Sequence, residues 1–462
     1  MQNDATAYRM KIVLALGWYF PEALGGTEVY VNGLAQRLAK RGHQVSVVAP
    51  LRGLAEPREY QHDGIRVFRF PLIGSAPTRD ECQTRVSARG SEFLREWLAK
   101  ESPDLLHVHT LLPGLSVFEL EAARAMGARI VMTSHLPDLG YICQRGTLMR
   151  WGRKLCDGKV GVLKCSACSL HSVGVPLPLA YPAAAISALI GNRLGWSQSR
   201  AATLLGMADL IRYRRQLQRR LLSTVNAFVL LNRGAMERVL INGARREQVT
   251  MNGLGISSII DPKPAPSVRP TSSPVRFGYV GRITAIKGVT ALANAWRALP
   301  PELAVELEWV GAVNDMEGRT LLARLKEQLG ADNRVRFLDA VPASEVGEIM
   351  RRLDVLIVPS ECFENGPTVV HEAFAAGTPV IGTRIGAMPE LIQDRVNGRL
   401  LTPGSVAELR DAIREIAVNP TETVDAWRRA LPVPRTMEQI VIDYERLYRE
   451  AVQKAPSTAA VS

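Results

Sequence analysis

The segment Lys11-Ile-Val-Leu-Ala-Leu16 has the length of one strand and is apolar at every position after Lys11, as expected of a buried strand. A loop containing Gly25-Gly26 follows it, and residues 27–41 then carry apolar side chains at helical spacing. A second apolar run over residues 44–49 completes a strand–helix–strand unit. Since parallel strands need a crossover of this kind, the segment predicts a doubly wound parallel α/β sheet.

The alternation of strands and helices continues along the chain and then restarts. Further strands are expected at residues 65–70, 105–109 and 130–134, with helices between them. A stretch rich in Pro and Ser, residues 261–274, predicts a linker. Beyond it, strands are expected at 275–280, 305–310, 335–338, 355–358 and 379–382, and helices at 289–298, 321–329, 346–352, 368–376 and 437–452.

The length of 462 residues is too great for one hydrophobic core. The composition, 47% hydrophobic and 22% charged, excludes extensive disorder and a small disulfide scaffold. Two Rossmann-like lobes facing each other would form a cleft, which is a common place for a ligand. We expect an N-terminal domain over 1–262 that includes a Cys- and Arg-rich insert at 143–222, a linker at 263–274, a C-terminal domain over 275–435, a helix at 436–455 and a mobile tail at 456–462.

Almost all of the net charge of +12 lies in one segment. Residues 145–220 hold thirteen basic and two acidic side chains, a net charge of +11. This basic block predicts an anionic partner for one surface. Nucleic acid is excluded, because the block lacks interleaved aromatic residues and any nucleic-acid-binding motif.

An anionic membrane fits the block better, because it encloses the uncharged run 172–192. Pro176, Pro178 and Pro182 leave only residues 183–190 as unbroken helix, so a membrane-spanning helix is rejected. Two interpretations stay open: a buried hairpin, or an interfacial segment beside the Arg-rich helix 211–222. Residues 1–9 have no apolar core of signal-peptide length, which favours the cytoplasm, with the protein peripheral on the membrane's cytoplasmic face.

Several features could hold a diphosphate. Gly366-Pro367-Thr368 begins a helix, whose free amides and dipole favour phosphate, with Pro at its first position. Arg282 and Lys287 flank a strand-to-helix turn and could neutralise both phosphates. Gly25 and Gly26 allow backbone to approach a ligand. No Asp-x-Asp pair, the usual carboxylate site for a magnesium diphosphate, occurs in the sequence.

Together these features resemble a known family. The stretch Glu364-Asn-Gly-Pro-Thr-Val-Val-His-Glu372 resembles the two-glutamate motif of retaining GT-B glycosyltransferases of the GT4 family. The resemblance covers most of the chain and includes 25–28, 41–45, His107-Val-His109, Ser134-His135, Asn252-Gly253, Gly281-Arg282 and Lys287-Gly288. It implies a GT-B fold and transfer of a hexose from UDP- or GDP-sugar, with retention and without a catalytic metal. The acceptor would be lipid-linked or a polysaccharide.

The resemblance also assigns roles to residues. Glu364 and His135 are the expected catalytic residues, and both would contact the donor sugar. Gly25, Gly26, Arg282, Lys287, Gly366, Pro367, Thr368 and Glu372 would bind the donor, with Glu372 accepting hydrogen bonds from the ribose hydroxyls. Many relatives have Glu-Gly-Phe-Gly where this chain has Glu364-Asn-Gly-Pro, a difference beside the sugar that leaves its identity open.

Two other functions compete with this hypothesis. A nucleotide-sugar epimerase would keep the fold, but the order of the GT4-type motifs speaks against it. A non-catalytic, zinc-bearing binding module would not need to retain Glu364, Glu372, Arg282, Lys287 and His135.

Four cysteines cluster in the insert. Cys143, Cys156, Cys165 and Cys168 are spaced Cys-x12-Cys-x8-Cys-x2-Cys, and a Cys-x2-Cys pair with two further thiols nearby favours a structural zinc site. Unrelated thiols and an iron–sulfur cluster are the alternatives.

Overall fold

The computed structural model describes residues 9–22, 25–190, 199–256, 274–311, 313 and 315–453. Of the predicted linker it describes only Pro274, and the tail 456–462 lies outside the described residues. The chain divides into two compact units. The first unit comprises residues 9–152, 156–253 and 437–453, and the second comprises residues 153–155 and 254–436.

The first unit is built on one eight-stranded sheet of order β10-β9-β6-β5-β1-β2-β4-β3. All neighbouring pairs are parallel except β3 and β4, so the doubly wound sheet predicted from the first strand–helix–strand unit is confirmed. The antiparallel edge strand β3 was not predicted. The strands are β1 Lys11–Ala15, β2 Gln44–Arg52, β3 Arg58–His62, β4 Ile65–Leu72, β5 Leu105–Val108, β6 Arg129–Ser134, β9 Ala227–Leu230 and β10 Val249–Met251.

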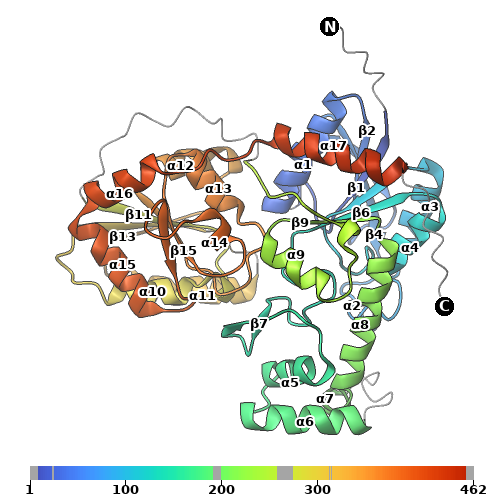
Figure 1. Ribbon diagram of the computed structural model, residues 1–462, viewed down its shortest axis with the longest axis horizontal. Coiled ribbons are helices and arrows are strands. Elements are labelled where there is room, and N and C mark those ends of the chain that lie inside the picture. Colours follow the sequence, from blue (N-terminus) through green and yellow to red (C-terminus); the bar gives the residue numbers. More distant parts are fainter. Residues whose placement is uncertain are drawn as a thin grey trace. The chain divides into compact units, whose positions relative to one another are not determined.

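Helices connect and cover these strands (Figure 1). Outside the insert they are α1 Gly26–Lys40, α2 Arg79–Cys82, α3 Ser91–Glu101, α4 Val117–Ala125, α9 Arg233–Leu240, the 3-10 turn η2 Arg246–Gln248 and α17 Met437–Gln453, while α8 Met207–Thr224 begins within the insert and ends just beyond it.

The last helix, α17, belongs to the first unit although it follows the second in sequence (Figure 1). Glu445 on α17 binds Arg41 at 2.7 Å and His43 at 3.0 Å. Tyr448 contacts His107 Nδ1 at 2.6 Å, and Tyr444 contacts Thr133 Oγ1 at 2.8 Å. These buried polar contacts dock the helix beside α1 and β6.

The second unit has a six-stranded, fully parallel sheet of order β13-β12-β11-β14-β15-β16. Its strands are β11 Val275–Val280, β12 Val305–Val310, β13 Val335–Leu338, β14 Val355–Val358, β15 Val380–Thr383 and β16 Gly398–Leu401. Its helical elements are η3 Ala285–Lys287, α10 Val289–Arg297, α11 Met316–Leu329, α12 Ala343–Arg352, α13 Thr368–Ala375, α14 Met388–Leu391, α15 Val406–Val418 and α16 Pro420–Arg429. The first four strands coincide with the predicted ranges.

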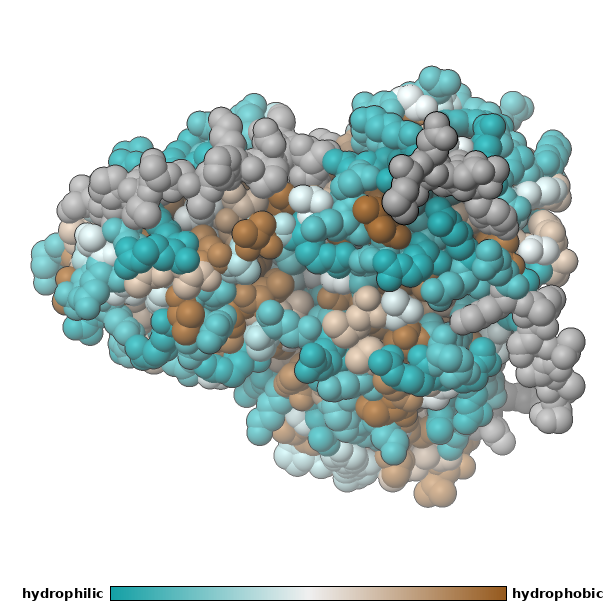
Figure 2. All heavy atoms as spheres, turned by 45° about the horizontal axis from the view of Figure 1, so that its top comes forward, coloured by the Kyte–Doolittle hydropathy of each residue, from teal (hydrophilic) through white to brown (hydrophobic). Residues whose placement is uncertain are grey.

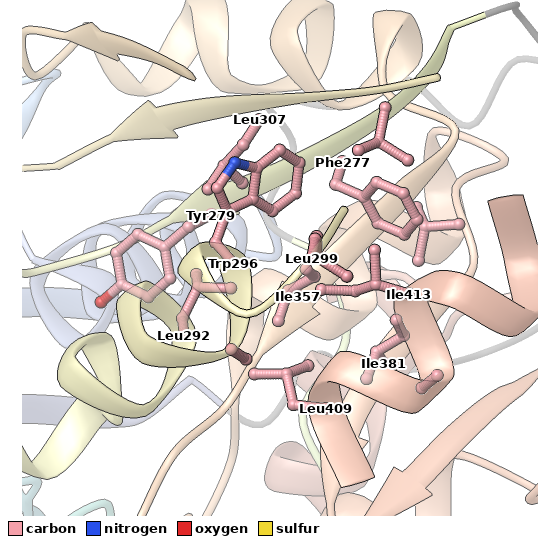
Figure 3. Packing of buried hydrophobic residues seen from close by; sticks show 14 of the residues in the cluster. Phe277, Tyr279, Leu292, Trp296, Leu299, Leu307, Ile357, Ile381, Leu409 and Ile413 are labelled. Carbon is pink, nitrogen blue, oxygen red and sulfur yellow. The ribbon is translucent and has the colours of Figure 1, made fainter. Parts of the chain in front are cut away.

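Helices cover both faces of this sheet, which is why its central strand β14 is continuously apolar and fully buried. Phe277 and Ile357 point to one face and pack with Trp296 of α10 and Ile413 of α15 (Figure 3). Leu356 of β14 points to the other face, into a second cluster with α12 and α13.

The insert contains the hairpin β7 Met149–Arg150 and β8 Lys154–Leu155, followed by helices α5 Val162–Ser172, α6 Leu177–Ile190 and α7 Arg200–Leu205. The prediction that prolines leave only residues 183–190 helical is wrong, because α6 begins at Leu177 and includes Pro182. Pro178 lies in the first turn, where the backbone N–H has no partner within the helix, so only Pro182 removes a helical hydrogen bond.

The uncharged run has two different faces. Ala180, Ala184 and Ser187 are buried in a small cluster with α5 and α8. The opposite side of α6 is exposed and includes Leu179, Tyr181, Ile186, Leu189 and Ile190. The buried side of α6 fits the interpretation of a buried hairpin, and its exposed apolar side does not. Among the described residues, no helix has both the length and the hydrophobicity needed to cross a membrane.

Candidate functional site

The candidate site of the second unit lies where β11 and β14 end. These strands are neighbours in the middle of the sheet, while the chain continues from β11 to β12 on the side away from β14. This is a topological switch point, where the loops after the two strands diverge and ligands commonly bind. The loop after β11 carries Arg282 and Lys287, and the loop after β14 carries Glu364.

Lys287 and Glu364 form an ion pair across these loops. Lys287 Nζ lies 2.6 Å from Glu364 Oε1, and Ser360 Oγ donates a hydrogen bond of 2.6 Å to the same oxygen. The Glu361 amide also donates to the Ile286 carbonyl at 2.8 Å. The structure thus brings together two residues that the sequence could only assign separately, and adds Ser360, which sequence reasoning missed.

Glycine allows this close approach. Gly288 has φ 71°, and a Cβ on it would lie 1.8 Å from the Pro359 carbonyl oxygen. Gly386 has φ 63°, and a Cβ there would lie 2.2 Å from the Glu364 carbonyl oxygen. Any larger residue would therefore push backbone segments apart on both sides of the site.

Helix α13 begins at Thr368, directly after the Glu364 loop. Pro367 is the N-cap in extended conformation, so the prediction that it is the first helical residue is wrong by one position. No side chain caps the helix and its first turn has no acidic residue, so the positive end of the dipole is not neutralised locally. Gly366 immediately precedes this helix start.

Two further charged residues of the predicted site have no partner of their own. Among the described residues, Glu372 on α13 makes no side-chain hydrogen bond or ion pair, and burial raises its pKa to about 7. Arg282 is exposed and has no ion pair within the part of the chain that the structure describes. A carboxyl group and a guanidinium in this state are available to a ligand.

The remaining predicted residues belong to the first unit. Gly25 is the N-cap of α1, and a Cβ on it would lie 2.4 Å from Glu28 Oε2. Gly26 is the first residue of that helix. His135 follows β6 directly, at the carboxyl edge of the sheet.

His135 is paired with a second histidine. His109 Nδ1 lies 3.0 Å from His135 Nε2, and burial lowers the pKa of both rings, that of His135 to about 4. Both imidazoles are therefore neutral at pH 7, and one must donate to the other. His109 Nε2 is buried with no hydrogen-bond partner among the described residues. The motif His107-Val-His109 was the sequence signal for this pair.

The four cysteines of the insert come together in space. Cys143, Cys156, Cys165 and Cys168 all line one cavity and are all free thiols. Cys82 is exposed and lies outside it, and Cys362 is buried beside Glu364.

Two family models match the chain. Residues 25–161 match the glycosyl transferase 4-like domain, and residues 274–419 match glycosyl transferases group 1. The matched segments include Gly25, His135, Lys287, Glu364 and Glu372.

The chain belongs to the GT4-type glycosyltransferases of group 1.

Relatives of this glycosyltransferase span most of its length. An MMP α-(1→4)-mannosyltransferase of Mycolicibacterium hassiacum is 24% identical over 86% of this chain and 87% of its own. A sucrose-phosphate synthase of Thermosynechococcus elongatus has a TM-score of 0.66 and 18% identity, over 95% of this chain and 98% of its own. Anabaena HepE, solved in complex with UDP and glucose, has a TM-score of 0.59 and 16% identity, over 95% of this chain and 100% of its own. These structural matches confirm the GT-B fold.

Replacing Glu372 by Gln is expected to stabilise the ligand-free glycosyltransferase at about pH 8. The pKa of Glu372 is raised from 4.5 to about 7, so its ionisation opposes folding above pH 4.5, and this penalty is complete above about pH 7. The gain in the free energy of unfolding should be about 1–3 kcal/mol at pH 8 and should shrink as the pH falls towards 4.5. Urea denaturation across this pH range measures it.

The matched control is Glu302→Gln in the loop between α10 and β12, which removes an exposed carboxylate of the same unit that lies outside any helix. This variant should match the wild type at every pH. Equal stability of Glu372→Gln and wild type at pH 8 would contradict the buried, unpaired state of Glu372.

Proposed function

We propose that this glycosyltransferase transfers a hexose from a UDP- or GDP-sugar, with retention, to a lipid-linked or polysaccharide acceptor. The observation that carries the proposal is the grouping of Lys287, Arg282 and the uncapped start of α13 at the switch point of the second sheet, beside the unpaired Glu372. Two cations and a helix N-terminus suit a diphosphate. An unpaired carboxylate suits ribose hydroxyls, which can donate to it.

Each residue has a proposed role on the donor. Lys287 and Arg282 hold the diphosphate, and the amide of Thr368 adds a donor. Glu372 accepts hydrogen bonds from the ribose. Glu364 binds hydroxyls of the sugar, held in place by Ser360 and Lys287. In the first unit, Gly26 offers an amide to the diphosphate and the neutral His135 contacts the sugar.

The proposed chemistry follows from these charges. Loss of the nucleoside diphosphate builds negative charge on the leaving oxygen, which fixed cations and amides stabilise. The sugar passes through an oxocarbenium-like state while the acceptor hydroxyl attacks from the face that the diphosphate leaves. A double displacement of the kind used by retaining glycosidases would need two carboxylates at the sugar, one of them free to attack the sugar as the nucleophile. Glu364 instead accepts from Lys287 and Ser360, which favours front-face attack.

The comparisons support the class of donor. HepE was solved with UDP and with UDP-glucose, and a starch synthase of similar fold with ADP and acarbose. These proteins are 15–17% identical to this chain, so they support a nucleoside diphosphate and leave the base and sugar to experiment.

We also propose that the protein works on the cytoplasmic face of an anionic membrane. The exposed side of α6 offers aliphatic and aromatic side chains, among which Leu189 is 87% exposed. Apolar side chains reach the surface in several brown areas of Figure 2. Beside α8 lies a groove bordered by four cations: Lys159, Arg215, Arg219 and Arg245. Apolar side chains on one helix and basic residues along the next suit lipid tails and anionic headgroups.

The structure changes which arginines can serve this surface. Arg214 lies 3.4 Å from Asp138, and Arg220 lies 2.5 Å from Glu121, so both are engaged within the protein. Arg215 and Arg219 form no ion pair with the described residues. The predicted headgroup contacts of the Arg-rich helix are therefore assigned to these two.

Lys287→Ala is expected to lower the rate of transfer by about one to three orders of magnitude, because one charge-assisted contact to the leaving diphosphate is lost. The assay offers radiolabelled nucleotide sugars with a membrane extract, and NMR of the product reads its anomeric configuration. Lys100→Ala, an exposed lysine of α3, is the control and should keep full activity.

Near-wild-type turnover of folded Lys287→Ala at saturating donor would overturn the diphosphate site. Conversion of the free nucleotide sugar, with no transfer, would favour the epimerase. If no donor supports either transfer or conversion of the nucleotide sugar, the result would favour the non-catalytic binding module.

Transfer is expected to continue without divalent cations, since Arg282, Lys287 and the start of α13 supply the positive potential. The assay is run with a magnesium chelator and then with magnesium restored. Activity that disappears and returns with magnesium alone would contradict metal independence.

Liposome flotation tests the membrane surface. Wild type should float with anionic vesicles and less with neutral ones, and Arg215→Gln/Arg219→Gln should float less at low salt, because headgroup attraction is screened over about 8 Å at physiological salt. Leu189→Gln should remove a salt-resistant part of the binding. The control Arg319→Gln/Arg324→Gln removes two exposed charges from α11 of the second unit and should float like wild type. Equal flotation of all four proteins, or of none, would overturn the membrane proposal.

A further inference from the structure

The cysteine cavity lies in the insert, and none of the residues that line it is assigned to the donor. It is small, with a volume of about 40 Å³, and all four insert cysteines border it. One water molecule needs about 10–15 Å³ of such space, so the cavity has room for an ion or for a few waters. Thiols that converge on such a space form a soft donor set, of the kind that selects zinc or an iron–sulfur cluster.

The four thiols come from two short elements that are close in sequence. Cys143 precedes the hairpin β7–β8 and Cys156 follows it directly, while Cys165 and Cys168 lie one helical turn apart near the start of α5. The Cys156 amide donates to the Leu148 carbonyl at 2.8 Å, which closes the hairpin. A hairpin and a helix start that each offer two cysteines can complete a tetrahedral site.

Backbone amides already point at two of the sulfurs. The Leu148 N–H donates to Cys143 Sγ at 3.4 Å, and the Gly158 N–H donates to Cys156 Sγ at 3.5 Å. Such donors orient a thiolate ligand and stabilise its negative charge. Arg145, Lys159 and Lys164 border the same cavity and would offset the net negative charge of a metal bound by four thiolates.

The backbone around the cavity needs a local cross-link. Leu148 and Trp151 have φ values of 53° and 58°, in the left-handed region that side chains with a Cβ disfavour. The nearest hydrophobic cluster is small and is centred on α5, α6 and α8 rather than on the hairpin. Leu148 and Met149 are buried and Trp151 packs against this cluster, so apolar packing holds one side of the hairpin, and a metal would cross-link it to α5.

We propose that Cys143, Cys156, Cys165 and Cys168 bind one structural zinc ion, which fixes the insert that carries α6. In their present rotamers, no three His, Cys, Asp or Glu side chains of the described residues are grouped closely enough to hold an ion. Rotation about the single Cα–Cβ bond moves each sulfur, so zinc binding is expected to change cysteine rotamers around the cavity.

The test is elemental analysis of the tag-free, full-length protein made in zinc-containing medium. Wild type should contain about one zinc per chain, and Cys165→Ser/Cys168→Ser should contain almost none. The matched control Cys82→Ser removes an exposed thiol outside the cavity and should keep the metal. Native mass spectrometry of wild type, before and after acid, should show the loss of one zinc mass, and this measurement does not depend on the folding of any variant.

A structural role has its own readout. After zinc removal, limited proteolysis should cut faster within residues 143–172, while cleavage of the second unit stays unchanged. The site would be overturned if wild type contained much less than one zinc per chain, or if the double variant kept its zinc. Iron with visible absorption in place of zinc would overturn the choice of metal.

Discussion

Parallel strands that pack on both faces keep their buried positions apolar, so the residues that could act on a ligand stand mainly in the loops where the strands end. Phe277 and Leu356 face opposite apolar clusters within one sheet, so the inward positions of β11 and β14 are apolar. The charged residues of the candidate site lie instead in the loops at the carboxyl edge. His135 follows the same rule at the end of β6 in the first unit.

Within that edge, two glycines decide how close the loops come. Gly288 and Gly386 leave space that the carbonyl oxygens of Pro359 and Glu364 occupy. Because the loops approach closely, Lys287 forms an ion pair with Glu364, and Lys287 and Ser360 both donate to its carboxylate. Glu372 has no such donor among the residues that the structure describes and carries a raised pKa, which is a cost to stability that a donor-binding role would explain.

The insert shows how a basic sequence segment divides into different structural roles. Arg214 and Arg220 neutralise acidic residues of the first unit, while Arg215 and Arg219 face a groove. Net charge alone therefore overstates the number of cations available to a membrane. The same insert carries an exposed apolar helix on a small core, which makes a metal cross-link physically useful.

The sequence by itself determined the class of fold, the four strands of the second unit from 275 to 358 and the family motif, because apolar periodicity and glycine placement are local properties. It also brought Lys287 and Glu364 into one hypothesis, through resemblance rather than geometry. The tertiary structure decided their ion pair, the His109–His135 contact, the helical state of Pro182 and the docking of Tyr444 and Tyr448 on the first unit. Most of these join residues far apart in sequence, and Pro182 depends on the packing of α6 on its neighbours. Long-range packing of this kind leaves no periodic signal in the chain, so it could not be predicted from local pattern.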